Sequence, residues 1–337
     1  MIQEAIKTIV KGSELPFETA RESMGEIMSG KASEAQIGAF LAALSLKGET
    51  VGEITGFARA MRDACVPVSH EGEVFEIVGT GGDGADTFNI STTSGFVIAS
   101  GGVAVAKHGN RSVSSRCGAA DCLEALGVNL ALTGKENTEL LKKAGMCFMF
   151  APVYHSSMKY AAPVRKALGF RTVFNILGPL GNPAGATMQL MGVYEEKLVE
   201  PMAKVLSNLG VKRGAVVYGM DGLDEITACD RTLVCEFKNG LFQKYLLDPR
   251  DYGMELAHPG DLKGGDSREN AEITRAVLSG EKGPKRNAVL LNAGMSFHLA
   301  ESMSLAEGIQ KAADLIDSGK ALAFMERFIR LSREAAQ

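Results

Sequence analysis

The 337-residue chain lacks the excess of positive charge that marks most proteins whose main partner is a nucleic acid. Lysine and arginine together number 36, aspartate and glutamate number 40, and the formal net charge is −4. A nucleic-acid partner is therefore not expected. The balance still leaves room for a local basic pocket that binds a small phosphorylated ligand.

Closely spaced cysteine pairs are also missing. The six cysteines are scattered along the chain, and none forms a C-x-x-C pair. In a chain of this length, isolated cysteines are usually reduced and mostly buried. Neither a disulfide framework nor a zinc site is expected.

Long apolar runs are absent as well. Two stretches carry no charge, residues 87–106 and 172–194, but the first is rich in Ser, Thr, Asn and Gly. The second is interrupted by Pro179, Pro183 and several glycines. Neither resembles a membrane span, and residues 1–11 do not resemble a signal peptide. The sequence predicts a cytoplasmic protein with no membrane partner.

The first 66 residues show only helical patterns. Ser33 with Gln36, and Thr50 with Glu53, have the spacing of capping boxes. In such a box, the side chain of each of the two residues accepts a hydrogen bond from the backbone N–H of the other at the start of a helix. Pro67 then stops helix formation. We predict a small helical domain over residues 1–66, to which a helical segment around 153–182 returns, including one helix over 155–168.

Strand and helix patterns alternate from Val74 onward, which indicates a mostly parallel sheet with helices on its faces. Asn239-Gly240 lies between two apolar runs and predicts a tight hairpin. The fold class is therefore α/β: a small all-helical domain plus a large α/β domain over 67–152 and 183–337, with a mostly parallel central sheet flanked by helices.

A glycine-rich segment, Gly79 to Asp83, follows the first predicted strand. Three glycines in five residues let backbone N–H groups approach an anion closely. The polar residues Thr87, Asn89, Ser91 and Thr92 follow where the next helix begins, and helix N-termini favour phosphate. The segment is neither a G-x-G-x-x-G motif nor a P-loop, and about half of such loops are merely tight turns.

A second polar segment, Lys107 to Ser115, is predicted to form a loop directly after the strand over residues 103–106. It carries two cations, amide and imidazole donors and three hydroxyls, but no acidic residue. These groups suit a pyrophosphate or phosphate ester. The carboxyl end of a strand is also where open α/β sheets bind ligands.

Adjacent acids, Asp224 and Glu225, follow the predicted strand over 215–218. Carboxylates beside a bound polyanion would repel it unless a divalent cation lies between them, and Mg²⁺ needs few protein carboxylates. Such a pair is more often solvated surface. Arg165 could pair with an acceptor's carboxylate. His108 could accept a proton, whereas His155 is interpreted as a structural hydrogen-bonding residue.

Four motifs then resemble the anthranilate phosphoribosyltransferase family. They are residues 79–83 (GTGGD), 107–127 (KHGNRSVSSRCGAADCLEALG), 171–183 (RTVFNILGPLGNP) and 221–227 (DGLDEIT). The resemblance covers nearly the whole chain and keeps the motif order. It implies a cleft between the two domains, and a homodimer paired through the helical domain.

The resemblance also implies residue roles. Phosphoribosyl pyrophosphate would be bound by Gly79, Gly82, Asp83, Thr87, Asn89, Ile90, Ser91, Thr92, Lys107, His108, Gly109, Asn110, Arg111, Ser112, Val113, Ser114, Ser115 and Ala119. Anthranilate would contact Gly79, Asn110 and Arg165, and magnesium would be held by Ser91, Asp224 and Glu225, with two ions per subunit. No catalytic residue is assigned beyond His108 as a late proton acceptor.

The implied activity is transfer of the phosphoribosyl group to the amine of anthranilate, a step of tryptophan biosynthesis. Two alternatives share the fold. Pyrimidine nucleoside phosphorylases carry a similar lysine loop, but theirs continues with Gly-Arg-Gly, where this chain has Asn110-Arg111-Ser112. A non-catalytic nucleic-acid-binding relative is disfavoured by the Asp224-Glu225 pair and the acidic balance.

Overall fold

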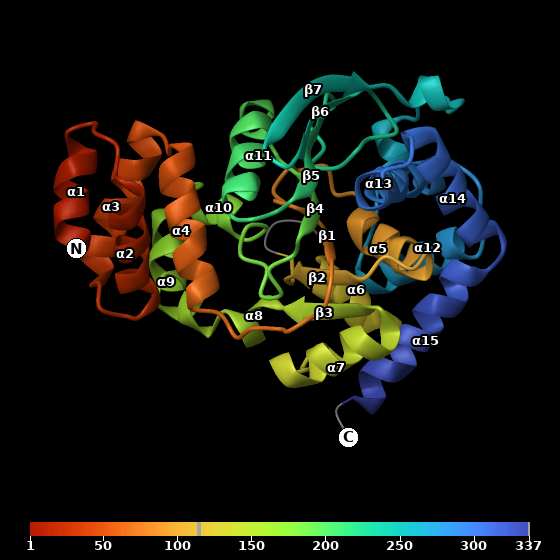
Figure 1. The fold of residues 1–337 in the computed structure, drawn as a ribbon, viewed down its shortest axis with the longest axis horizontal. Helices are drawn as coiled ribbons and strands as arrows, with labels where there is room; N and C mark the ends of the chain where they lie inside the picture. The colour runs from red at the N-terminus through yellow and green to blue at the C-terminus, as the bar shows by residue number, and fades with distance from the viewer. Residues whose placement is uncertain (113–115, 336–337) are drawn as a thin grey trace.

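A computed structural model describes residues 1–112 and 116–335. A helical part lies beside a larger α/β part, whose sheet is seen edge-on between layers of helices (Figure 1). The predicted fold class is confirmed. Val113, Ser114 and Ser115, which were predicted to bind the phosphoribosyl donor, lie outside the described residues.

The helical part begins with four helices: α1 (Ile2–Val10), α2 (Phe17–Met28), α3 (Glu34–Lys47) and α4 (Val51–Asp63). The two predicted capping boxes are confirmed, since the Ser33 and Thr50 side chains accept hydrogen bonds from the third backbone N–H of α3 and α4. Phe40 and Phe57 join α3 to α4 through an edge-to-face contact, with ring centroids 5.7 Å apart.

The returning segment contains α8 (Ala151–Tyr154), a 3₁₀ turn η1 (Ser156–Tyr160), α9 (Ala162–Leu168) and α10 (Phe174–Leu177). The single helix predicted over 155–168 is wrong, because a 3₁₀ turn and a new helix occupy these residues. Pro163 accounts for the break: it has no N–H to donate and is accommodated in the first turn of α9. α9 packs against α3.

Seven strands form one sheet among the described residues. They are β1 (Phe75–Gly79), β2 (Val105–Gly109), β3 (Met146–Phe150), β4 (Met188–Gly192), β5 (Arg213–Gly219), β6 (Thr232–Lys238) and β7 (Leu241–Leu247). Their order is β3-β2-β1-β4-β5-β6-β7; the first five are parallel, and β6 and β7 are antiparallel. The predicted hairpin is confirmed, with φ of 51° at Asn239 and 80° at Gly240.

Helices cover both faces of the sheet. They are α5 (Ile90–Ser100), α6 (Ala119–Leu126), α7 (Gly134–Ala144), α11 (Val199–Asn208), α12 (Ser267–Leu278), α13 (Pro284–Glu301), α14 (Leu305–Asp317) and α15 (Lys320–Glu334). Short 3₁₀ helices are η2 (Glu196–Leu198), η3 (Pro249–Tyr252) and η4 (Pro259–Leu262). α11 lies between the sheet and the helical part, while α5 and α13 lie on the opposite face (Figure 1).

Besides a small apolar cluster around α7, β2 and β3, two large apolar cores follow from this layering. One joins α5, α13 and neighbouring helices to the sheet, and the other runs from the sheet across α11 into the helical part. Burial of this continuous apolar surface therefore holds the helical part against the sheet. Among the described helices, none is both long and apolar enough to cross a bilayer.

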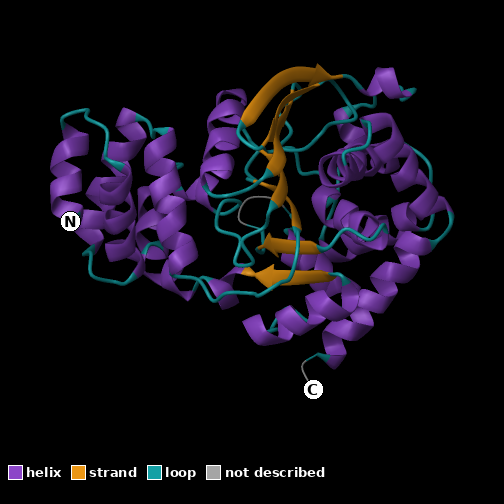
Figure 2. Cartoon of the chain, viewed as in Figure 1, coloured by secondary structure: helices purple, strands orange, loops and turns teal. Residues whose placement is uncertain are grey.

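The sheet opens between β1 and β2. These strands share one register pair, Phe75↔Val105, whereas β1 and β4 share five. β2 and β3 accordingly run in a different direction from the other strands (Figure 2). Side chains fill the gap: the His108 N–H donates to Glu76 Oε1 at 3.2 Å, and Lys107 Nζ donates to the Ile77 carbonyl at 2.7 Å. Buried polar side chains thus replace ladder hydrogen bonds where the strands diverge.

Glu76 makes stability depend on pH. Burial raises the pKa of its carboxyl to about 7, so ionisation destabilises the folded state more than the unfolded state. The stability that the protonated form confers is lost as the pH rises from the ordinary glutamate pKa through about 7. As the pH is raised from 5 to 8, we expect the free energy of unfolding of Glu76→Gln to rise relative to that of wild type by on the order of 1–3 kcal/mol.

Urea unfolding of both proteins at the two pH values measures this difference. Glu139→Gln, at an exposed position on α7, is the matched control. If the difference in the free energy of unfolding between wild type and Glu76→Gln were the same at both pH values, the expectation would be contradicted.

Candidate active site

The glycine turn at the end of β1 is tied to the acidic pair. The Gly81 N–H donates to Asp224 Oδ2 at 2.6 Å, and Thr80 Oγ1 approaches the same oxygen at 3.5 Å. Gly81 and Gly82 have φ values of 69° and 76°, which side-chain-bearing residues rarely adopt. Two segments 143 residues apart in sequence therefore meet at one edge of the sheet.

The beginning of α5 joins the same cluster. The Ser91 N–H donates to Glu225 Oε1 at 3.1 Å. Asn89 bonds the Cys117 carbonyl at 3.3 Å, and its own side-chain oxygen accepts from Asn270 Nδ2 at 2.9 Å. The hydroxyl of Thr92 is buried without a hydrogen-bond partner in the described residues. Polar groups are thus gathered at the start of α5, where a carboxylate from outside the helix satisfies the Ser91 N–H.

Two neighbouring residues that were predicted to bind the donor, Ile90 and Thr87, make other contacts. Ile90 is buried in the core, and Thr87 forms an isolated bridge with Lys263. Asn270 is a residue that sequence reasoning missed, and no local pattern marks it, because it lies 181 positions from the asparagine that it orients.

Lys107 is buried, with 1% of its surface exposed. Its ammonium donates to the Ile77 carbonyl and, at 3.3 Å, to Ser91 Oγ. The prediction that a loop begins at Lys107 is wrong: β2 continues through Gly109. Paired with β3 as far as Gly109↔Phe150, the strand points Lys107 and His108 to opposite faces of the sheet.

Three carboxylates crowd the edge of the sheet. Burial raises the pKa of Asp224 well above its ordinary value, and the nearby Asp83 and Glu225 raise it further. Burial likewise raises the pKa of Glu225 to about 7, although Lys107 acts in the opposite direction. Carboxylates so crowded favour a bound cation. In the described residues, no group of three or more His, Cys, Asp or Glu side chains is arranged to hold a metal by itself.

His108 lies on the other face, with ring centroids 5.0 Å from His155. Burial lowers the pKa of His108 to about 3 and that of His155 to about 4. Each imidazole is therefore neutral at physiological pH and a weak proton acceptor. Both Nε2 atoms are buried and have no hydrogen-bond partner in the described part of the chain.

The residues after β2 lie against α6. Arg111 donates to Asp121 and Glu124, each at 2.8 Å, so α6 supplies the acids that the loop itself lacks. Asn110 is exposed, and its carbonyl accepts from the Ala120 N–H at 3.2 Å. Ser112 donates its N–H to Asp121, and Ala119 begins α6. A β-carbon on Gly109 would contact Phe148 and Ala119, which explains glycine there.

Arg165 belongs to α9, on the returning segment. Its guanidinium lies 5.1 Å from the centroid of the Phe174 ring, and burial lowers its pKa. No acidic side chain forms an ion pair with it among the described residues. A half-buried cation without a protein counter-ion suits an anionic ligand group.

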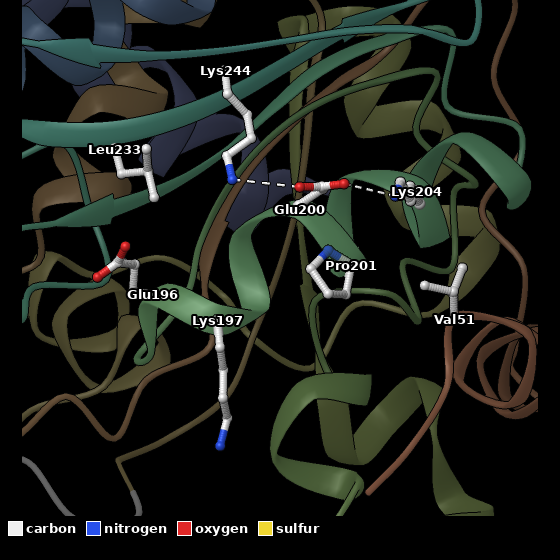
Figure 3. Close-up of a pocket in the computed structure, with 8 residues that line it drawn as sticks. All are labelled: Val51, Glu196, Lys197, Glu200, Pro201, Lys204, Leu233 and Lys244. Atoms are coloured by element: carbon white, nitrogen blue, oxygen red, sulfur yellow. Dashed lines mark hydrogen bonds and ion pairs between the residues drawn. The ribbon is translucent and has the colours of Figure 1, made fainter.

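A separate hollow of about 550 Å³ lies between η2–α11, the β6–β7 hairpin and the start of α4. It is lined by Val51, Glu196, Lys197, Glu200, Pro201, Lys204, Leu233 and Lys244. Figure 3 shows Lys204 and Lys244 both directed at Glu200, at 2.7 and 3.4 Å, while Lys197 points away. None of the predicted site residues lines this hollow, and its cations are partly neutralised by its own acids.

Comparison with known proteins agrees with this geometry. Residues 3–65 match the helical bundle domain of a glycosyl transferase family, and residues 71–322 match its a/b domain. Anthranilate phosphoribosyltransferases from Lachnoclostridium phytofermentans and Methanobrevibacter smithii are each 55% identical, covering 98% of this chain and 99% and 98% of the relatives. The chain belongs to the anthranilate phosphoribosyltransferase family.

Solved structures of this family have the same fold. The Thermus thermophilus anthranilate phosphoribosyltransferase superposes with a TM-score of 0.93 at 45% identity, over 98% of this chain and 99% of that one. The Saccharomyces cerevisiae enzyme in complex with PRPP and Mg gives 0.91 at 28% identity, over 99% and 98%. The nucleoside phosphorylase alternative is disfavoured, because these high-coverage relatives carry the transferase name.

Gly192, at the end of β4, was not predicted as a site residue, although a glycine ending a strand often marks a close backbone approach. A β-carbon there would overlap the Asp224 carbonyl. We expect Gly192→Ala to displace the acidic pair, lower kcat/KM at least about tenfold and destabilise the fold by about 1–3 kcal/mol.

Steady-state kinetics and urea unfolding measure the two effects of Gly192→Ala. Gly25→Ala, within α2 and with open space at its β-carbon position, is the control and should be neutral or slightly stabilising. Wild-type kinetics in Gly192→Ala would show that the close approach is unimportant.

Proposed function

We propose that this chain transfers the phosphoribosyl group of phosphoribosyl pyrophosphate to the amine of anthranilate, giving N-(5-phosphoribosyl)anthranilate and pyrophosphate. One observation carries the proposal: the glycine turn, Ser91, Lys107 and the acidic pair are joined by direct hydrogen bonds at one edge of the sheet. The product class places the enzyme in tryptophan biosynthesis.

The donor site would use these groups together. Lys107, the N–H groups of the glycine turn and the start of α5 would bind the pyrophosphate, with Gly79, Gly82, Asp83, Thr87, Asn89 and the residues from Lys107 to Ser115 around it. The glycines and the hydroxyl, amide and ammonium groups among them would supply donors or a close approach to an anion, whereas Asp83 would contribute a further carboxylate beside the metal. The departing pyrophosphate would be stabilised there once the Gly81 and Ser91 N–H groups exchange their carboxylate partners for the anion.

Magnesium fits the same edge. Asp224 and Glu225 are buried carboxylates with raised pKa values, and Ser91 lies beside Glu225. We propose that these three residues hold Mg²⁺, two ions per subunit, which would neutralise charge on the leaving pyrophosphate. The yeast enzyme solved with PRPP and Mg supports this choice of cation.

The acceptor site is proposed at Gly79, Asn110 and Arg165. The Arg165 guanidinium would pair with the anthranilate carboxylate, and a yeast relative has been solved with 4-fluoroanthranilate. The amine of anthranilate is neutral at physiological pH, so attack needs no strong base. With its pKa lowered to about 3 by burial, His108 is better suited to packing and hydrogen bonding than to accepting a proton.

The assembly is proposed to be a cytoplasmic homodimer paired through the helical domain, residues 1–66. Val10 on α1 and Leu46 on α3 are 70% and 90% exposed, and these two helices pack on each other. A contact that covers these two side chains would remove exposed apolar surface from water. The proposed domain division is 1–66 with the returning 153–182, against 67–152 and 183–337.

The acidic pair tests the proposed function. With anthranilate, phosphoribosyl pyrophosphate and Mg²⁺, wild type should consume anthranilate, which is followed by the loss of its fluorescence. The double variant Asp224→Asn, Glu225→Gln should lose roughly a hundredfold or more in kcat/KM and should respond weakly to Mg²⁺, because several kcal/mol of charge stabilisation are removed.

An exposed acidic pair provides the control: Asp251→Asn, Glu255→Gln should retain wild-type rates. Phosphorolysis of thymidine or uridine is measured in parallel and should not occur. Wild-type rates in the Asp224/Glu225 variant would remove the metal assignment, and nucleoside phosphorolysis without anthranilate consumption would favour the phosphorylase alternative.

Arg165 tests the acceptor site. Arg165→Ala should raise the KM for anthranilate about 10- to 100-fold, because a charge-assisted hydrogen bond is lost, with a much smaller effect on the KM for the donor. Lys166→Ala, the next residue and exposed, should leave both constants unchanged. An equal effect of Arg165→Ala on both substrates would contradict its role.

A further inference from the structure

The segment Arg171–Pro183 joins the two parts of the molecule. On the helical side, Ser45 Oγ donates to the Arg171 carbonyl at 3.4 Å, and Arg62 Nε donates to the Leu180 carbonyl at 2.7 Å. On the sheet side, Asn182 Nδ2 donates to the Ala106 carbonyl at 2.9 Å. The segment is thus fixed to α3, α4 and β2 at once.

Arg171 extends from this segment to the glycine turn. Its Nη2 donates to the Gly82 carbonyl at 2.5 Å, and its guanidinium lies 4.1 Å from the centroid of the Tyr194 ring. Glu195 Oε1 lies 3.7 Å from Nη1. A planar guanidinium can stack on an aromatic ring and donate in its own plane at the same time, so the geometry suits arginine specifically.

The turn is therefore held from both sides. Asp224 accepts the Gly81 N–H, and Arg171 donates to the carbonyl of the next residue. Gly81 and Gly82 both have positive φ and no side chain to restrict them. The Thr80 N–H also donates to the Gly192 carbonyl, and Asp83 accepts from Ala85, so the ends of the turn are held separately. The contacts from Asp224 and Arg171 restrain the two glycines between those ends.

The same arginine lies close in sequence to the acceptor segment. α9, which carries Arg165, ends at Leu168, and only Gly169 and Phe170 separate that helix from Arg171. A movement of the glycine turn that shifts the backbone of Arg171, and not its side chain alone, would therefore be absorbed within two residues or be passed on to α9.

We propose that Arg171 is a positioning residue that couples the donor site to the acceptor site. This inference rests on the proposed function, since it takes the glycine turn as part of the donor site and Arg165 as part of the acceptor site. Donor binding at the turn fixes Arg171, and Arg171 fixes the start of the 171–183 segment and the end of α9. By linkage, each substrate then strengthens the binding of the other.

The test is the dependence of the KM for anthranilate on the concentration of phosphoribosyl pyrophosphate, with Mg²⁺ saturating. In wild type, this KM should fall about fivefold or more as the donor is raised from trace to saturating levels. In Arg171→Ala, the dependence should disappear. The KM for the donor should rise about 3- to 10-fold, a modest loss because the side chain is half-exposed.

Two further variants separate coupling from a general structural role. Arg171→Lys restores the charge without the planar fork and should recover part of the dependence. Tyr194→Leu removes only the ring beneath the guanidinium and should weaken the dependence without changing any proposed substrate contact. Arg21→Ala is the matched control, since Arg21 is an exposed arginine bonded to Asp63, and it should keep the full dependence.

The inference is overturned if wild type shows no such dependence, if Arg171→Ala retains it, or if Arg21→Ala loses it equally. Melting temperatures of all variants should stay within about 2–4 °C of wild type, so that any kinetic change belongs to the folded protein. If Arg171→Ala is silent while the Asp224/Glu225 and Arg165 variants behave as expected, the inference alone fails. If those variants are silent too, the proposed site itself fails.

Discussion

The buried ammonium of Lys107 is the interaction on which the candidate site depends. It joins β2, which carries it, to the β1 carbonyl of Ile77 and to Ser91 at the start of α5. Burial lowers the pKa of this lysine, and Glu225, Glu76 and Asp224 raise it. A cation buried without such partners would cost several kcal/mol. The acids around it therefore have a structural reason to be there, apart from any ligand.

This charge cluster follows from how the sheet is built. Parallel strands deliver their carboxyl ends to one edge, so the glycine turn after β1, the end of β2 and the acidic segment after β5 converge there. The divergence of β1 from β2 then leaves Ile77 and His108 with backbone groups that need partners. Lys107 and Glu76 satisfy them, which places titratable side chains inside the sheet rather than on its rim.

Sequence reasoning predicted the parts of the site that local patterns encode. The glycine turn, the polar start of α5 and the Asp-Glu pair each follow a recognisable strand, and each lies at the predicted edge. The end of β2 was misplaced because a lysine and a histidine inside a strand look like the start of a loop. Pairing with β3 and the buried partners of Lys107 make a strand conformation favourable there. Neutralisation of Arg111 by Asp121 and Glu124 was missed for a similar reason, since those acids belong to the next helix.

The contacts that no sequence pattern encodes are those that connect distant segments. Gly192 is glycine because the backbone of Asp224 crosses it, and Asn270 orients Asn89 from 181 residues away. The 171–183 segment belongs to the same class: its turn residues identify a loop, but not that the loop is bonded to α3, α4 and β2 together. Because one apolar core also runs from the sheet through α11 into the helical part, movement between the two parts must be accommodated in these connecting segments. Arg171 belongs to one of these connecting segments and is bonded to the glycine turn. A structural change at the donor site would therefore reach the acceptor site through a residue of this kind.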